Sequence, residues 1–367
     1  MDSAQHNLLD DLEHVMCDRN LENRAAMLRR VTDLFVGAPR TLTREQIALF
    51  DDVMARLVEK IDTSARAAFG HVLTTLSVVP PKVIRRLAAD ETIEVAGPIL
   101  AHSEQLDEIT LVESAKTKSQ AHLLAISRRK ALGEPVTDIL VQRGDQQVVR
   151  STVQNPGAAF SEFGYSTLVA RSATDGDLAA CVWSRPEIPR QHLLRLFAGA
   201  SDAVKTMLTK KDPRKSSIIQ EVVAQAAQKL QAGTRAVSPG YAAAQAYVRA
   251  LQEAGKLDEA QLVEFVQEKK FEETAIALSL ISDLPISLIE RVLVDEISEK
   301  VIVIAKAAGL SWQTVRAVLL LTHDENSCAK NSLDRQFEMF TRLQIETARK
   351  AIRFYRFRER ALAVKTD

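Results

Sequence analysis

The side chains best suited to metal binding or nucleophilic catalysis are scattered along this chain. Its seven histidines include no HExxH motif, and the three cysteines, Cys17, Cys181 and Cys328, include no CxxC pair. The one local combination is His323-Asp324 near Cys328, but the segment "THDENSCAKNS" is typical of a loop. We predict no metal site. The least favoured alternative, an enzyme with an unrecognised site, has His323 and Asp324 as its best candidates.

The sequence also lacks the loops that hold phosphate groups. Neither GxGxxG nor GxxxxGK[ST] occurs, so no nucleotide cofactor is predicted. Acidic pairs such as Asp51-Asp52 and Glu272-Glu273 are adjacent, and adjacent residues diverge by about 100° around a helix, as they do on solvated faces. We therefore expect no cofactor and no acid–base couple, and we favour a protein that is not an enzyme.

The most distinctive local chemistry lies in the C-terminal "TRLQIETARKAIRFYRFRERALAVK". Between Arg349 and Arg360 there are six basic residues and one acidic residue, interleaved with three aromatic residues. This mixture suits phosphate contact with base stacking, or an anionic membrane surface. The residues of this segment that we place on an interaction surface are Lys350, Arg353, Arg356, Phe357 and Arg360.

The same segment has a structural interpretation, which we favour. One long helix would align a stripe of residues on one face, namely Phe337, Phe340, Gln344, Ala348, Ile352 and Tyr355. Such a helix would cover the end of a helical array or pair with a second subunit, so a homo-oligomer through the C-terminal helix stays open.

Arg129 and Arg185 are two further candidates for an interaction surface, because they occupy equivalent positions in a duplicated segment, each before a proline. A row of guanidinium groups would capture carboxylates or phosphates. The structural alternative is that each cation stabilises a helix C-terminus and binds its free carbonyl groups. We favour the structural alternative for both arginines.

Arg129 and Arg185 lie in a unit that is repeated along the sequence. The segments 122–141 and 178–197 align without a gap at an offset of 56, with coincident apolar positions, and similar segments recur near Leu76 and Leu262. Each contains a proline followed by an apolar run at helical spacing, as in "ISDLPISLIERVLVD". Because proline ends one helix and suits the first turn of the next, each one marks a corner between helices.

This pattern predicts an all-α protein, an α-solenoid of helical repeats in one or two segments. The low aromatic content of 5% agrees with helices rather than sheets. We predict an N-terminal helical-repeat domain at 1–208, a linker or hinge at 209–217, and a C-terminal helical-repeat domain with a long terminal helix at 218–367. An exposed loop within one continuous array is the alternative for "TKKDPRKSS" at 209–217.

Charge and hydropathy limit the compartment and the partners. The 48 basic and 48 acidic residues cancel, which disfavours a protein that coats nucleic acid. The acidic start "MDSAQHNLLDDLEHVM" is unlike a secretory signal, and no stretch approaches 18 uncharged apolar residues. We expect a cytoplasmic protein without a membrane span.

The residues "ADETIEVAGPILAHSEQLDEITLV", "PVTDILVQRGDQQVVRSTVQNPGAAFSEFGYSTLV" and "WSRPEIP" resemble a bacterial family, domain of unknown function 2336. The resemblance covers residues 88–189 and extends toward "DEISEKVIVIAKAAGLS". It implies HEAT-like helical repeats and supplies no catalytic residues.

The function that we favour from the sequence is a non-enzymatic scaffold or regulatory adaptor that binds another protein, whose identity is unknown. The alternative is a nucleic-acid-binding protein with a basic groove, built from the C-terminal arginines and four cations near the predicted linker, Lys210, Lys211, Arg214 and Lys215. That alternative requires these residues to lie together.

Overall fold

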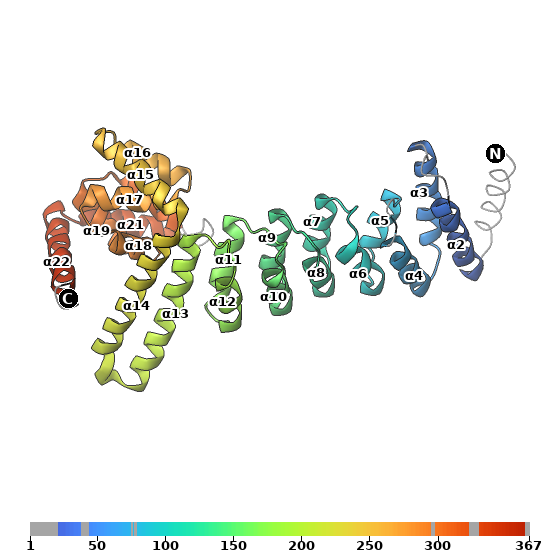
Figure 1. Ribbon diagram of the computed structural model, residues 1–367, viewed down its shortest axis with the longest axis horizontal. Helices are drawn as coiled ribbons and strands as arrows, with labels where there is room; N and C mark the ends of the chain where they lie inside the picture. Colours follow the sequence, from blue (N-terminus) through green and yellow to red (C-terminus); the bar gives the residue numbers. More distant parts are fainter. Residues whose placement is uncertain are drawn as a thin grey trace. The chain divides into compact units, whose positions relative to one another are not determined.

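The computed structural model describes residues 21–37, 44–74, 76, 79–294, 298–322 and 330–363 (Figure 1). This part of the chain is helical and contains no β-strand, apart from an isolated bridge between Leu132 and Ala158. The predicted all-α class is therefore confirmed. The chain divides into two compact units, Met1–Leu168 and Val169–Asp367.

Unit 1 consists of short helices that contact only near neighbours along the chain. Each packs mainly against the next helix and the next but one, so that α5, α7 and α9 form one row and α6, α8 and α10 the other (Figure 1). Its helices are α2 (Leu21–Gly37), α3 (Arg44–Val58), α4 (Thr63–Thr74), α5 (Pro81–Ala88), α6 (Ile93–His102), α7 (Glu108–Thr117), α8 (Gln120–Ser127), α9 (Glu134–Arg143) and α10 (Gln146–Gln154). Helix α11 (Glu162–Ser172) spans the division between the units.

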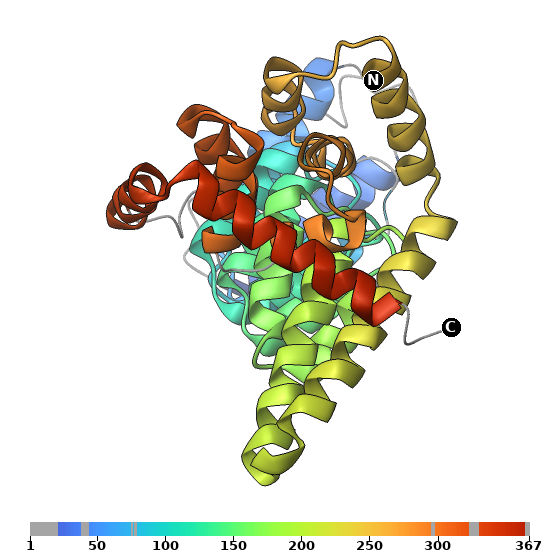
Figure 2. The ribbon, with the colours of Figure 1, turned by 90° about the vertical axis from the view of Figure 1, so that its left-hand side faces the viewer.

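Unit 2 has a single large core built from helices α15 to α20, against which α13 and α22 also pack. Helices α13 and α14 form a hairpin whose far end projects from this core (Figures 1 and 2). The elements are α12 (Gly176–Trp183), α13 (Arg190–Lys211), the 3-10 turn η1 (Pro213–Lys215), α14 (Ser216–Val237), α15 (Pro239–Glu253), α16 (Glu259–Gln267), α17 (Phe271–Ser282), α18 (Ile286–Val294), α19 (Ser298–Ala308), α20 (Trp312–Thr322), α21 (Lys330–Arg342) and α22 (Ile345–Ala363).

Proline marks helix starts in both units, as the repeat predicted. Pro81, Pro135 and Pro239 lie in the first turn of α5, α9 and α15. Pro189 and Pro285 immediately precede α13 and α18. The backbone N–H groups of the first helical turn have no intrahelical acceptor. Each proline therefore fixes a corner without removing an intrahelical hydrogen bond.

Side-chain caps complete these corners. The carboxylates of Asp107, Asp145, Asp175 and Asp258 each accept a hydrogen bond from the backbone N–H three residues further on, at the starts of α7, α10, α12 and α16. Ser238 does the same for α15. Such caps satisfy an otherwise unpaired donor, and the aspartates also place a negative charge at the positive end of the helix.

Two predictions about the boundaries differ from the structure. The predicted linker at 209–217 is the end of α13, the turn η1 and the start of α14, and the two units divide instead at Leu168–Val169. Most of its residues are exposed because they form the tip of a hairpin. The tip of a hairpin and a linker have the same polar composition.

The predicted long helix through Phe337 and Tyr355 is also broken. It ends as α21 at Arg342, and α22 begins at Ile345. Trp312 packs against both Phe337 and Phe340, with ring centroids 5.3 and 5.6 Å away, and Lys306 donates to the carbonyl of Phe340 at 2.9 Å. Residues of α19 and α20 thus contact the last turns of α21, just before the chain changes direction.

Candidate functional site

A polar groove of about 780 Å³ lies beside α8 and α10 in unit 1. Four of its lining residues are basic, and none is acidic. The lining residues are Leu124, Ser127, Arg128, Arg129, Lys130, Gln146, Gln147, Arg150, Ser151, Gln154, Asn155 and Pro156. We refer to this feature as the α8–α10 groove.

The floor of the groove is fixed by hydrogen bonds between its two helices. The hydroxyl oxygens of Ser127 and Ser151 lie 2.7 Å apart. The amide of Asn155 donates to the carbonyl groups of Ser127 and Arg129 at 2.9 and 2.6 Å. Asn155 therefore holds the turn after α8, which carries the basic residues, against the end of α10.

One end of the groove depends on a close backbone approach. A Cβ on Gly157 would lie 1.9 Å from the carbonyl oxygen of Lys130. Only glycine allows this contact, which is followed by the bridge in which Leu132 donates to Gly157 and Ala159 donates to Leu132, both at 2.9 Å. Nothing in the sequence singles out this position.

Arg129 connects the turn beside the groove to helix α6. Its guanidinium is buried and donates to the carbonyl groups of Leu100 and Ser103, both at 2.7 Å, at the C-terminus of α6. Burial lowers the pKa of Arg129, and the nearby charge of Glu104 opposes that effect. This placement supports the structural interpretation of Arg129, although the carbonyl groups belong to a neighbouring helix rather than to its own.

The cations that face solvent in the groove are Arg128 and Lys130. Neither forms a side-chain hydrogen bond or ion pair with any described residue. Arg150, from α10, is half-buried. Sequence comparison of the repeats selected the buried Arg129 and missed the two exposed neighbours, although the basic run Arg128-Arg129-Lys130 was a visible signal.

Arg185, the equivalent of Arg129 in the duplicated segment, is also buried. Its guanidinium forms an ion pair with Glu187, two residues away. Like Arg129, it is held inside the fold, so the structure favours the structural interpretation for both members of the pair.

Unit 2 contains a buried charge cluster that the sequence did not reveal. Arg190 pairs with Glu272 at 2.6 Å and with the fully buried Glu290, whose second oxygen accepts from Arg235 at 2.6 Å. Arg190 also lies over the ring of Tyr241, 5.2 Å from its centroid. We refer to these five residues as the charge cluster.

The charge cluster joins helices rather than presenting a reactive group. Its members come from α13, α14, α15, α17 and α18, and guanidinium groups occupy both oxygens of Glu290. Burial raises the pKa of Glu272 even though Arg190 opposes the shift, and burial raises the pKa of Tyr241 as well. A visible clue existed: Glu290 interrupts the apolar face of "ISLIERVLV".

The chain matches a known protein family over most of its length. Residues 95–353 match a family described as an uncharacterised protein conserved in bacteria (DUF2336). The chain belongs to this family, domain of unknown function 2336. No match was found among curated proteins or among solved structures. The family region contains both the α8–α10 groove and the charge cluster.

The C-terminal basic segment falls partly inside the DUF2336 region, and its residues have different surroundings. Lys350 and Arg353 are exposed. Arg356 instead donates to the carbonyl of Ser282 at 2.7 Å and pairs with Asp283 at 3.0 Å, at the end of α17. The side chains of Phe357 and Arg360 lie outside the described residues.

Helix α22 packs through its apolar face. Ala348 and Ile352 are buried, and the helix lies against α19. Phe354 and Tyr355 are 64% and 42% exposed, so the predicted apolar stripe ends before Tyr355. The packing of α22 agrees with a helix that covers the core, while the exposed Phe354 beside Arg353 leaves an aromatic-basic surface.

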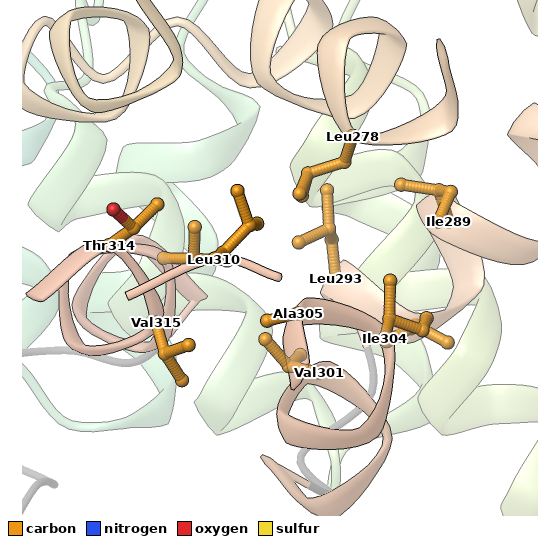
Figure 3. Close-up of a pocket in the computed structure, with 11 residues that line it drawn as sticks. Leu278, Ile289, Leu293, Val301, Ile304, Ala305, Leu310, Thr314 and Val315 are labelled. Atoms are coloured by element: carbon orange, nitrogen blue, oxygen red, sulfur yellow. The ribbon is translucent and has the colours of Figure 1, made fainter. Parts of the chain in front are cut away.

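An apolar cavity in unit 2 of this DUF2336 protein is too small to be a ligand site. Side chains from α17 to α20 converge on it, including Leu278, Leu293 and Val315 (Figure 3). Its volume of about 10 Å³ is at the limit for a single water molecule. We therefore treat it as an imperfection of the core.

The remaining candidates give no site within the described part of the chain. Among the described residues, no group of three or more His, Cys, Asp and Glu side chains could hold a metal ion. His122 is buried and contacts Ser119 and the carbonyl of Asp90, as expected for a structural residue. Cys17, His323, Asp324 and Cys328 lie outside the described residues. None of the described helices combines the length and apolar character that crossing a bilayer requires.

Proposed function

We propose that this protein is a non-enzymatic scaffold or regulatory adaptor of the bacterial cytoplasm, built as an α-solenoid of HEAT-like repeats. Its α8–α10 groove would bind an acidic segment of a partner protein. The neighbour-to-neighbour packing of unit 1 supports the repeat architecture, because each solenoid repeat contacts only the repeats beside it. Solenoids of this kind present extended concave surfaces to their partners.

The observation that carries the proposal is the charge of the groove. Its basic residues meet no carboxylate in the lining, so a ligand that supplies carboxylates would gain charge-assisted hydrogen bonds. Gln146, Gln147 and Gln154 add side-chain amides, which both donate and accept and so match the groups of a peptide backbone. An extended acidic peptide fits both features.

Nucleic-acid binding is the second candidate, and one observation favours it: Phe354 is exposed beside Arg353 on α22. The groove itself does not share this chemistry, because its lining contains no aromatic side chain on which a base could stack. The cations Lys210, Lys211, Arg214 and Lys215 lie at the tip of a projecting hairpin, not in a concave surface (Figures 1 and 2).

The test is affinity purification of the full chain from its native cytoplasm, with and without nuclease. We expect a protein partner that survives nuclease and is eluted by poly-glutamate. The variant Arg128→Glu with Lys130→Glu should lose it. The matched control, Lys60→Glu with Lys116→Glu, reverses two exposed cations elsewhere in unit 1 and should retain it. Recovery of nucleic acid alone, released by salt, would instead establish the second candidate.

A further inference from the structure

The far part of the α13–α14 hairpin has no core of its own. Every residue from Phe197 to Leu230 is described, and none of them is buried. Yet five large apolar side chains in this part are strongly exposed, with exposed fractions between 38% and 60%. These five, the hairpin stripe, are Val204, Met207, Leu208, Ile218 and Val222.

The hairpin stripe lies on one face. On α13, the half-buried residues that face α14 are Ser201, Lys205 and Thr209; on α14, residues that face α13 include Ile219 and Val223. Val204 and Leu208 each precede a facing residue by one position, and so do Ile218 and Val222. One position is a rotation of about 100°, and two antiparallel helices rotated by the same amount present their residues on the same side.

The charges around the hairpin stripe are mostly positive. Lys205 and Lys215 pair with Asp202 and Asp212, at 3.8 and 3.2 Å. Three further cations at the tip, Lys210, Lys211 and Arg214, and a fourth on α14, Lys229, have no ion pair with a described residue. By helical position, Lys211 and Lys229 share the face of the stripe, one near the tip and one near the base.

This charge pattern argues against a second copy of the chain as the occupant. If two hairpins paired through their stripes with the tips together, the Lys211 side chains of both copies would lie at the same end of the interface. If they paired with the tips apart, Lys211 of one copy would lie at the same end as Lys229 of the other. Like charges would then lie together in the interface in either orientation, which costs affinity.

We propose that the hairpin stripe rests on an anionic membrane surface, as a peripheral contact. An interfacial amphipathic surface buries its apolar face about 5–10 Å into the headgroup boundary and is attracted by anionic lipids. The long stems of Lys211 and Lys229 would lie along the apolar layer while their ammonium groups reach lipid phosphates. Because the hairpin projects from the core of unit 2, its face is accessible (Figure 2). The proposal is independent of the α8–α10 groove.

The experiment is co-sedimentation of the full chain with vesicles of phosphatidylcholine, with or without about one third phosphatidylglycerol. We expect sedimentation with anionic vesicles and about tenfold less with neutral ones. The variant Leu208→Gln with Ile218→Gln should lower binding about tenfold, and Lys211→Gln with Lys229→Gln should remove the preference for anionic lipid. The matched control, Val36→Gln with Leu49→Gln, changes two apolar residues of unit 1 that are 54% and 57% exposed and should bind normally.

Three outcomes would overturn the proposal. The first is no sedimentation with anionic vesicles. The second is that the stripe variant binds vesicles normally but converts a dimer to a monomer in light scattering, which would assign the stripe to a second copy. The third is that the variant loses a co-purified protein while the native chain ignores vesicles, which would assign it to a partner helix. Circular dichroism of each variant checks that the fold is intact.

Discussion

The two units stabilise their helices over very different distances along the chain. In unit 1 the buried polar contacts join residues about 30 positions apart: Arg129 binds Leu100, 29 positions away, and His122 binds Asp90, 32 positions away. In unit 2 Arg190 binds Glu290, 100 positions away, and Arg356 binds Ser282, 74 positions away.

This difference shows which unit depends on the whole of its sequence. A helix that contacts only its near neighbours loses local stability when one contact is removed, because the effect passes only to those neighbours. A core closed by contacts between distant segments requires all of them at once. We therefore expect local unfolding in unit 1 and cooperative unfolding in unit 2.

The largest effect should come from opening the charge cluster. Glu290→Gln leaves two buried guanidinium groups without their carboxylate, and breaking a buried pair costs about 3–5 kcal/mol in the free energy of unfolding. Urea denaturation measures the loss. The control, Glu268→Gln, removes a half-exposed partner of Lys270 and should change little. A loss below about 1 kcal/mol for Glu290→Gln would mean that the cluster does not hold unit 2 together.

The second prediction compares two buried aliphatic residues, one in each unit. Leu140→Ala and Ile289→Ala should each cost about 2–5 kcal/mol, since both side chains are almost fully buried. Hydrogen exchange should then differ. For Leu140→Ala, faster exchange should be limited to α7, α8, α9 and α10, whereas for Ile289→Ala it should extend over α15 to α20. Equally local patterns in both variants would remove the distinction between the units.

The third prediction concerns the anchor of the α8–α10 groove. Arg129→Met removes two hydrogen bonds and leaves the carbonyl groups of Leu100 and Ser103 unpaired, at a cost of about 1–3 kcal/mol. Arg129→Lys should not restore stability, because an ammonium cannot reproduce a two-pronged guanidinium contact. Thermal unfolding compares the three proteins. Full recovery with lysine would show that only the charge matters.

Sequence reasoning succeeded where the physical cause is local. The prolines at helix starts and the all-α class follow from periodicity and backbone chemistry, and the structure confirms them. The role of Arg129 was half visible: a cation near helix carbonyl groups, but on a different helix.

What the sequence could not show depends on long-range contacts. No spacing rule connects Arg190 to Glu290, so the charge cluster was invisible beyond an acidic residue on an apolar helix face. The segment 209–217 was predicted as a linker or hinge because it is polar, and polarity alone does not distinguish the tip of a hairpin from a hinge. The groove was missed because only solvent exposure distinguishes Arg128 and Lys130 from the buried Arg129. The exposure of three neighbouring basic residues cannot be read from their sequence.

The smallest effect tests whether distance along the chain matters by itself. Glu259 accepts from the backbone of Ser311, 52 positions away, at 2.7 Å, and from the hydroxyl of Thr314. Burial would raise the pKa of Glu259, but these hydrogen bonds outweigh it and hold the pKa below its ordinary value. The stabilisation is therefore present at neutral pH and is lost as the pH falls through the lowered pKa.

Glu259→Gln should therefore lower stability at pH 7 by less than any of the four destabilising variants above, and the difference from the native chain should vanish in strong acid. Thermal unfolding across this pH range measures it. Because Glu259 is only half-buried, a small effect would show that burial, more than separation in sequence, sets the strength of the long-range contacts in unit 2. A loss as large as that of Glu290→Gln would make separation the deciding quantity, and the contrast between the units would then rest on topology alone.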